Sequence, residues 1–282
     1  MNDHSRAPQH MVFHPKKRLG QCFLVNRSIA QKIIAHSRFG PSDTVLEIGP
    51  GMGALTIALA RIVRHVVAIE KDPELFKRLE MILHQESLNN VTLILGDILK
   101  LDFEELKEFF ETKILALGNL PYNISSPLVA KLVANRQCMD RAILMFQREF
   151  AERLISGPGS KSYGAITVML RYRARARKLF KVSSGSFVPR PKVESMVVEL
   201  DFNHPWPHAP VSDKELRRVV KPAFSQRRKT LINALLGAPG TWDRETLLAA
   251  MESCGINPSR RAETLEPDEF ICLANALKLT IS

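Results

Sequence analysis

The chain has 282 residues, 45% of them hydrophobic and 24% charged, a near-average globular composition that excludes disordered, collagen-like and coiled-coil classes. No apolar run reaches the roughly 18 residues that a membrane-spanning helix needs, and no apolar segment follows the basic N-terminus, so we expect a cytoplasmic protein that does not bind membranes. The formal net charge of +11 makes a polyanion the first partner to consider.

In chain order, short β-branched runs alternate with helical stretches from Thr44 onward, a pattern typical of βαβ units and a mostly parallel sheet. The predicted strands span residues 44–48, 66–70, 91–95, 113–118 and 141–146. The predicted helices span residues 54–64, a stretch beginning at Pro73, 148–155 and 165–172. Two later β-like runs, 178–182 and 193–202, predict an antiparallel hairpin at the edge of the sheet.

Three prolines between residues 203 and 210 predict a linker. Beyond it, a small all-helical domain over residues 211–282 is predicted from helical stretches at 213–223, 227–236, 244–253 and 267–279. The first 15 residues show no periodic pattern and are predicted to form a flexible arm. Residues 16–202 then make up the α/β domain.

The cysteines are widely separated, with no C-x-x-C pair and no histidine at zinc-ligand spacing; they are Cys22, Cys138, Cys254 and Cys272. We therefore expect no metal site and no disulfide framework, but reduced thiols.

A glycine loop follows the first predicted strand of the alternating region and leads into a helix, with the sequence E-I-G-P-G-M-G from Glu47 to Gly53. Such a loop is either a tight turn or a place where the backbone approaches a nucleotide, although its spacing is not G-x-G-x-x-G. Glu70 ends the next strand, where doubly wound nucleotide folds place an acid that accepts ribose hydroxyls. Asp97, after the third strand, is positioned to accept from an adenine amino group.

The tetrapeptide N-L-P-Y, from Asn119 to Tyr122, is the most specific signal in the chain. An exocyclic amino group is a poor nucleophile because its lone pair is delocalised into the ring. The Asn119 side-chain oxygen and the Leu120 carbonyl are suited to accept its two N–H groups, and Tyr122 is suited to stack on the base. A proline turn with a buried tyrosine is the bland alternative.

Taken together, these motifs resemble the S-adenosylmethionine-dependent rRNA adenine N6-dimethyltransferases. Further matches are K-K-R-L-G-Q-C-F-L (16–24), F-V-P-R-P-K-V (187–193) and F-S-Q-R-R-K-T-L (224–231), so the resemblance covers nearly the whole chain. It implies a Rossmann-like methyltransferase sheet with a small C-terminal helical domain. The branch that the chain is most similar to dimethylates two adjacent adenosines in the 3′-terminal hairpin loop of small-subunit rRNA.

The resemblance also implies a set of site residues. S-adenosylmethionine would be bound by Gln21, Cys22, Leu24, Gly49, Gly51, Glu70, Asp97, Ile98 and Asn119. The catalytic set would be Asn119, Leu120, Tyr122 and Phe187, with Phe187 stacking on the flipped base opposite Tyr122. Phe187 is otherwise an ordinary core aromatic. Relatives usually carry Asn or His at position 22, and Cys22 weakens cofactor binding only if that side chain makes the contact.

Two basic clusters predict contacts to RNA phosphates. Residues 171–192 hold eight basic residues and no acidic one, and three adjacent cations open a predicted helix at 227. The predicted contacts are Arg171, Arg173, Arg190, Lys192, Arg227, Arg228 and Lys229. A solvated charged face is the alternative for any single run.

The expected activity is N6,N6-dimethylation of adenosine by a monomer that acts on rRNA in an immature 30S particle, with a role in subunit biogenesis and no metal. An assembly factor whose binding matters more than its methylation is a second hypothesis. Methylation of large-subunit rRNA is the nearest enzymatic alternative. A nicotinamide oxidoreductase is disfavoured by the glycine spacing and by N-L-P-Y.

Overall fold

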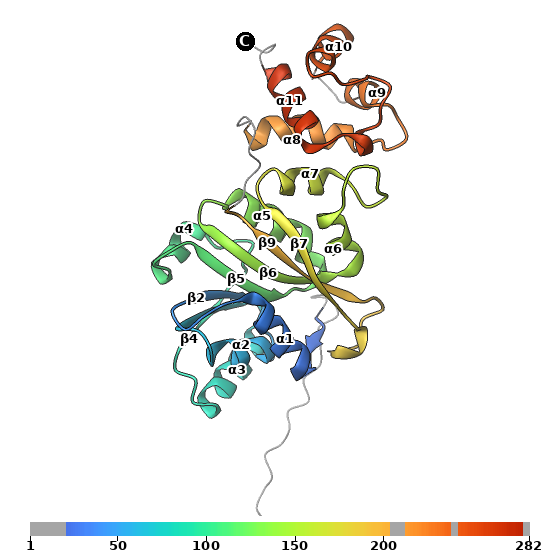
Figure 1. Ribbon diagram of the computed structural model, residues 1–282. Helices are drawn as coiled ribbons and strands as arrows, with labels where there is room; N and C mark the ends of the chain where they lie inside the picture. The colour runs from blue at the N-terminus through green and yellow to red at the C-terminus, as the bar shows by residue number, and fades with distance from the viewer. Residues whose placement is uncertain (1–20, 204–211, 238–241, 279–282) are drawn as a thin grey trace, which may run out of the picture.

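The computed structural model describes residues 21–203, 212–237 and 242–278 (Figure 1). The predicted flexible arm lies outside the described residues, as does residue 204 onward of the predicted linker. Among the described residues, no helix is both long enough and apolar enough to cross a membrane.

A seven-stranded sheet forms the centre of the molecule, in the order β4-β3-β2-β5-β6-β9-β7. Its strands are β2 (Thr44–Ile48), β3 (His65–Glu70), β4 (Val91–Leu95), β5 (Ile114–Asn119), β6 (Met139–Gln147), β7 (Arg175–Val182) and β9 (Ser195–Asp201). The first five run parallel, whereas β9 is antiparallel to both β6 and β7. The predicted antiparallel pair is present, with β9 inside the sheet and β7 at its edge.

Helices cover both faces of this sheet, as a parallel sheet requires (Figure 1). On one side lie α1 (Arg27–Ser37), α2 (Ala54–Ala60) and α3 (Pro73–Gln85). On the other lie α4 (Phe103–Leu106), α5 (Ser125–Ala134), α6 (Arg148–Ile155) and α7 (Ala165–Arg171). Successive strand residues enter opposite cores: Val66 packs with the α1 and α2 side, and Val67 packs with the α5 side.

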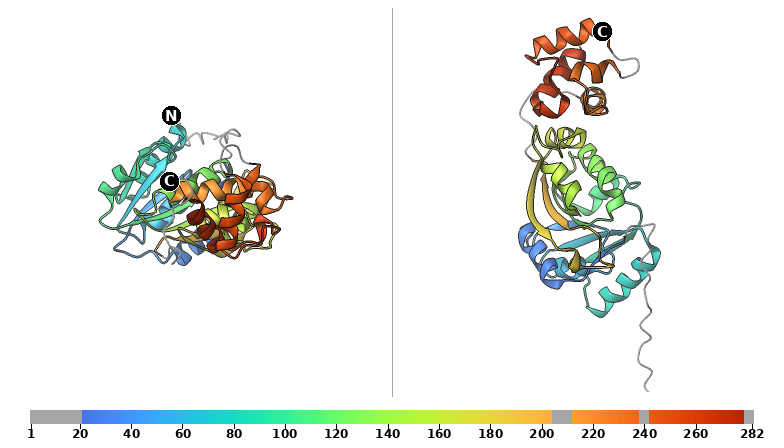
Figure 2. Two further views of the ribbon diagram at one scale, coloured as in Figure 1. Left: turned by 90° about the horizontal axis from the view of Figure 1, so that it is seen from above. Right: turned by 90° about the vertical axis from the view of Figure 1, so that its right-hand side faces the viewer.

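The C-terminal part is helical, as predicted, and lies beyond α7 (Figure 2). It comprises α8 (Asp213–Ala223), α9 (Leu231–Leu236), α10 (Arg244–Ser253) and α11 (Pro267–Lys278). Its core also includes Tyr163, Val168 and Tyr172 from the α7 region, so this core extends across the predicted domain boundary. The predicted helix start at Arg227 is wrong: residues 224–229 form turns, and α9 begins only at Leu231.

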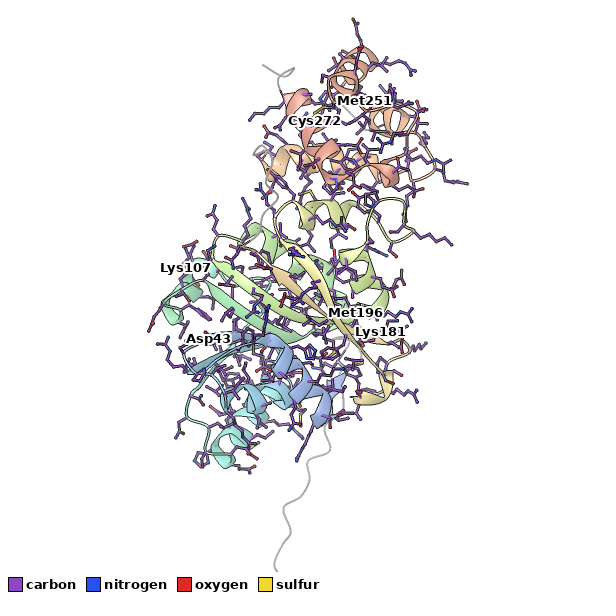
Figure 3. The ribbon with its side chains drawn as sticks, viewed as in Figure 1. Asp43, Lys107, Lys181, Met196, Met251 and Cys272 are labelled. Carbon is purple, nitrogen blue, oxygen red and sulfur yellow. A yellow bond between two sulfur atoms is a disulfide. The ribbon has the colours of Figure 1, made fainter. Side chains whose placement is uncertain are left out.

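The expectation of four reduced cysteines is also wrong. Cys254, at the end of α10, and Cys272, in α11, form a disulfide with 5.9 Å between their Cα atoms (Figure 3). The two cysteines are 18 residues apart in sequence, and it is the packing of α10 against α11 that brings them together. The sequence spacing alone therefore did not indicate the pair. Cys22 and Cys138 are free thiols, as predicted.

Candidate active site

A cavity lies at the carboxyl ends of the parallel strands, where the strand order reverses around β2. Doubly wound sheets bind ligands at this switch point because the loops from neighbouring strands diverge there. The loops that follow β2, β3, β4 and β5 line the cavity, together with residues 21–24. All nine predicted cofactor-binding residues line it: Gln21, Cys22, Leu24, Gly49, Gly51, Glu70, Asp97, Ile98 and Asn119.

The glycine loop between β2 and α2 has the backbone geometry that its sequence predicts. Gly49, Gly51 and Gly53 have φ angles of 68°, 58° and 80°, in the left-handed region that side chains disfavour. A Cβ at Gly53 would also lie 2.6 Å from a methyl carbon of Leu79 in α3. The loop therefore stays narrow and exposes backbone to the cavity.

Glu70, at the end of β3, holds this loop in place. One carboxylate oxygen accepts from the Gly51 N–H at 3.0 Å and the other from the Asp72 N–H at 2.8 Å. Burial raises the pKa of Glu70, while these backbone bonds favour its charged form. The carboxylate thus links the glycine loop to the start of α3, whose N-cap is Asp72.

Asp97 is held by an ion pair that the sequence analysis did not anticipate. Its Oδ2 lies 2.8 Å from Lys71 Nζ, and its Oδ1 accepts from the Leu99 N–H at 3.0 Å. Burial acts to raise the pKa of Asp97, but the bonds from Lys71 and Leu99 outweigh it and hold that pKa below its usual value. Asp97 is therefore ionised and fixed at the cavity wall.

Residues 21–24 are fastened across the cavity mouth. Strand β1 (Phe23–Leu24) pairs with β8 (Phe187–Val188), and Gln21 donates to Asp72 at 3.1 Å. The Cys22 carbonyl accepts from Asn119 Nδ2 at 3.2 Å. Cys22 thus contacts the N-L-P-Y motif through its backbone. Burial raises the pKa of its thiol, which stays protonated at neutral pH.

The N-L-P-Y motif turns from β5 into a short 3₁₀ helix, Tyr122–Ile124. Asn119 Nδ2 donates to the Cys22 carbonyl, and this bond fixes the orientation of the side-chain amide. The Asn119 Oδ1 is the acceptor atom of that amide. The Leu120 side chain is 2% exposed and anchors the turn in the core. Tyr122 is half-buried, and its hydroxyl lies 3.1 Å from Ser195 Oγ of β9. This contact holds the ring at the edge of the site.

Phe187 occupies the position of an ordinary core aromatic. It is 3% exposed and pairs with Leu24 across the β1–β8 sheet, within the core on the α1 side. In this conformation its ring is not open to a base, so its stacking on the target base stays a prediction. The pairing of β1 with β8 explains why Phe187 is buried. The sequence did not show this, because residues 23–24 and 187–188 are far apart along the chain.

Glu47 is a cavity residue that the sequence analysis did not assign to the site. It lies within β2, is 1% exposed, and its Oε2 has no hydrogen-bond partner among the described residues. Burial raises its pKa to about 8, an effect that nearby Thr56 opposes and Glu70 reinforces. An acidic residue inside an otherwise apolar strand was the signal that could have identified it.

The predicted RNA contacts of the first basic cluster fall into two groups. Arg173 is engaged: its Nε donates to Asp213 of α8 at 2.7 Å, its guanidinium lies 3.9 Å from the Tyr172 ring centroid, and its side chain is 13% exposed. Arg171 is half-buried and donates to the Ile155 carbonyl at 3.4 Å. Arg190 and Lys192 are exposed, near the β8 end of the site.

The second cluster is similarly divided. Arg227 Nη2 donates to the carbonyls of Lys161 and Tyr163, at 2.8 Å and 3.1 Å, and so ties the α8–α9 turn to the loop before α7. Arg228 and Lys229 are exposed. For Arg227 and Arg173, a role in holding the helical part on the sheet domain is visible. Phosphate binding by this set stays a prediction.

The fold and this cavity define a Rossmann-like methyltransferase. A crystallised dimethyladenosine transferase from Plasmodium falciparum superimposes with a TM-score of 0.74 at 29% identity, covering 89% of this chain and 95% of its own. The 23S rRNA methyltransferase ErmE, 24% identical, shares the fold with a TM-score of 0.68 over 91% of this chain and 99% of its own.

The family follows from the sequence comparisons. The profile of the ribosomal RNA adenine dimethylase family matches residues 12–279, and the chain belongs to that family. A ribosomal RNA small subunit methyltransferase A from Syntrophotalea carbinolica is 43% identical over 95% of this chain and 98% of its own. Its counterpart from Desulforapulum autotrophicum is 42% identical over 93% of this chain and 92% of its own.

The cofactor of this family is S-adenosylmethionine, and the cavity residues fit it. A buried carboxyl group with an unpartnered oxygen, Glu47, leaves a polar contact open to a ligand in the cavity. Glu70 and Asp97 add two carboxylates, and the glycine loop allows close backbone approach. Apolar Leu24 and Ile98 complete the lining and suit a planar base.

Proposed function

We propose that this enzyme dimethylates N6 of two adjacent adenosines in the 3′-terminal hairpin loop of small-subunit rRNA. The carrying observation is that Asn119, the first residue of N-L-P-Y, lies in the wall of the cofactor cavity with its amide oriented by the Cys22 carbonyl. Full-length similarity to small subunit methyltransferases supports the choice of rRNA.

The bound cofactor supplies an activated methyl group on a sulfonium. The chain's own residues then act by alignment. The Asn119 oxygen and the Leu120 carbonyl accept the two N–H groups of the adenine amine, which localises the lone pair on N6. Tyr122, held by Ser195, offers a ring edge or face to the extruded base. The proton released from N6 passes to solvent.

Purified protein is incubated with radiolabelled S-adenosylmethionine and 30S particles that lack the modification, and the RNA is digested to nucleosides. We expect label in N6,N6-dimethyladenosine from small-subunit rRNA. A parallel incubation contains large-subunit rRNA in place of the 30S particles. Label in that RNA and none in the 30S particles would instead support methylation of large-subunit rRNA.

Asn119→Ala should abolish labelling while RNA binding persists, because the variant loses one acceptor and no positive charge. Asn233→Ala, on the exposed side of α9, is the matched control and should retain full activity. Equal activity of Asn119→Ala and wild type would contradict the role of Asn119. A role as an assembly factor, also proposed, predicts that subunits mature normally in cells that carry only Asn119→Ala.

A further inference from the structure

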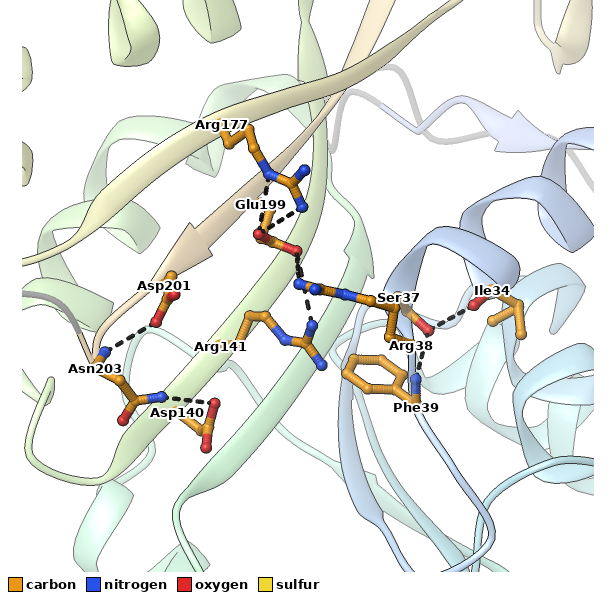
Figure 4. A network of polar contacts seen from close by, with 10 residues as sticks. All are labelled: Ile34, Ser37, Arg38, Phe39, Asp140, Arg141, Arg177, Glu199, Asp201 and Asn203. Atoms are coloured by element: carbon orange, nitrogen blue, oxygen red, sulfur yellow. Dashed lines mark hydrogen bonds and ion pairs between the residues drawn. The ribbon is translucent and has the colours of Figure 1, made fainter.

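Three arginines converge on one buried carboxylate on the α1 side of the sheet, away from the cofactor cavity (Figure 4). Glu199 of β9 is 5% exposed. Its Oε2 accepts from Arg38 at 3.0 Å and lies 3.7 Å from Arg141, and its Oε1 accepts from Arg177 at 3.0 Å. Three guanidiniums and one carboxylate leave two positive charges in excess at this point.

The excess charge is presented to solvent. The side chains of Arg38 and Arg177 are 62% and 52% exposed, whereas that of Arg141 is 14% exposed and stacks over Phe39 at 5.5 Å. Burying one carboxylate requires one cation, and Arg141 already lies next to it. The two exposed arginines therefore exceed what neutralising Glu199 requires, and each keeps N–H donors on its outer side.

The backbone at Arg38 gives an independent indication. Arg38 ends α1 with φ 58° and ψ 30°, a left-handed position where glycine or asparagine is cheaper. An arginine at such a position raises the conformational free energy of the backbone, and this strain points to a function for the Arg38 side chain. Lys32, six residues before Arg38 on α1, has its Nζ 4.4 Å from the centroid of the Phe180 ring of β7 and extends the positive surface.

This surface shares a sheet face with the site. Ser195, which contacts Tyr122, and Glu199 are an even number of residues apart on β9 and so point to the same side. Four residues of strand place them about 13 Å apart. The inference requires that RNA delivering an adenosine to Tyr122 continues over this side of the molecule, where a flanking phosphate can meet the arginines.

We infer that Arg38 and Arg177, oriented by Glu199, form a phosphate-binding surface for the RNA that flanks the target adenosines. The inference rests on the proposed function. Guanidiniums held in fixed orientation suit phosphate oxygens, because their N–H groups form paired bonds at little further entropic cost. Edge-strand cations also prevent strand pairing between molecules, a role that Arg177 of β7 alone would fill.

The test measures binding of a synthetic RNA hairpin with the 3′-terminal small-subunit sequence by fluorescence anisotropy between 0.05 M and 0.5 M salt. Losing two phosphate contacts should reduce the slope of log K against log salt by about 1.4, which is about 25-fold in affinity at 0.1 M salt. We expect this for Arg38→Ala/Arg177→Ala, and about half the change in slope for Arg38→Ala alone.

The control is Arg61→Ala/Arg64→Ala, which removes the same charge from arginines that pair with Glu86 and Glu111 near the opposite edge of the sheet. Its slope should stay at the wild-type value. An unchanged slope in the Arg38 variants, or an equal change in the control, would overturn the inference. Because Arg38 is exposed, Arg38→Ala keeps the test valid even if the double variant fails to fold. Failure of the proposed function would appear separately, as absent methylation by wild type.

Discussion

Glu47→Gln should make the protein's stability less sensitive to pH, since Glu47 is a carboxyl group buried in β2. Its pKa rises from 4.5 in the unfolded chain to about 8 in the folded one, through burial. Between those values the unfolded chain has lost the proton and the folded chain retains it, so stability falls as pH rises. Each pH unit costs about 1.4 kcal/mol, and the whole window about 5 kcal/mol as an upper bound.

Denaturant unfolding of wild type and Glu47→Gln at pH 5, 6, 7 and 8 measures this contribution. The stability difference should shift in favour of the variant across the window and level off above about pH 8. Glu149→Gln is the control, because that side chain is 84% exposed and its removal should give a difference independent of pH. A pH-independent difference for Glu47→Gln would refute the assignment of a buried, protonated carboxyl group.

Three further predictions concern other parts of the fold. Glu70→Gln should weaken S-adenosylmethionine binding about tenfold by calorimetry, because an amide cannot accept both backbone N–H groups; unchanged affinity would argue against the cofactor role. Gly53→Ala should lower the free energy of unfolding by about 1–3 kcal/mol, given its φ of 80° and the approach to Leu79, and wild-type stability would contradict the strain. Cys272→Ser should lower the free energy of unfolding by about 3 kcal/mol without reductant. With reductant, the wild-type free energy of unfolding should fall to that of the variant, and a wild-type value insensitive to reductant would contradict the bond to Cys254.

The sheet was predictable because its inner strands, such as β2 and β3, are buried on both faces and so appear as continuous apolar runs rich in β-branched residues. Thr44–Ile48 and Val91–Leu95 have the predicted bounds. Helices α1 and α5 were not predicted, although Ile29, Ile33 and Ile34 show helical spacing in α1 after the N-cap Asn26. The sequence pattern of α1 therefore does indicate a helix. The start of α9 does not show in the sequence, because residues 224–229 form turns that no periodic pattern marks.

The cofactor cavity was predictable for a different reason. Its residues follow successive parallel strands, and the carboxyl ends of such strands meet at one edge. Phe187 and Arg227 could not be placed in the same way, because their surroundings come from distant segments: Leu24 in one case, and the carbonyls of Lys161 and Tyr163 in the other. Charge and residue type alone do not show which partners the fold will bring.

Pairing also decides which cations remain available to RNA. In sequence, Arg173 and Arg177 belong to the same acid-free cluster. In the fold, Arg173 is enclosed against Tyr172 and Asp213, and its charge is used to join α8 to the sheet domain. Arg177 shares a single carboxylate with two other arginines and stays half exposed. A phosphate gains most from the second kind of arginine, because no desolvated partner has to be given up when it binds.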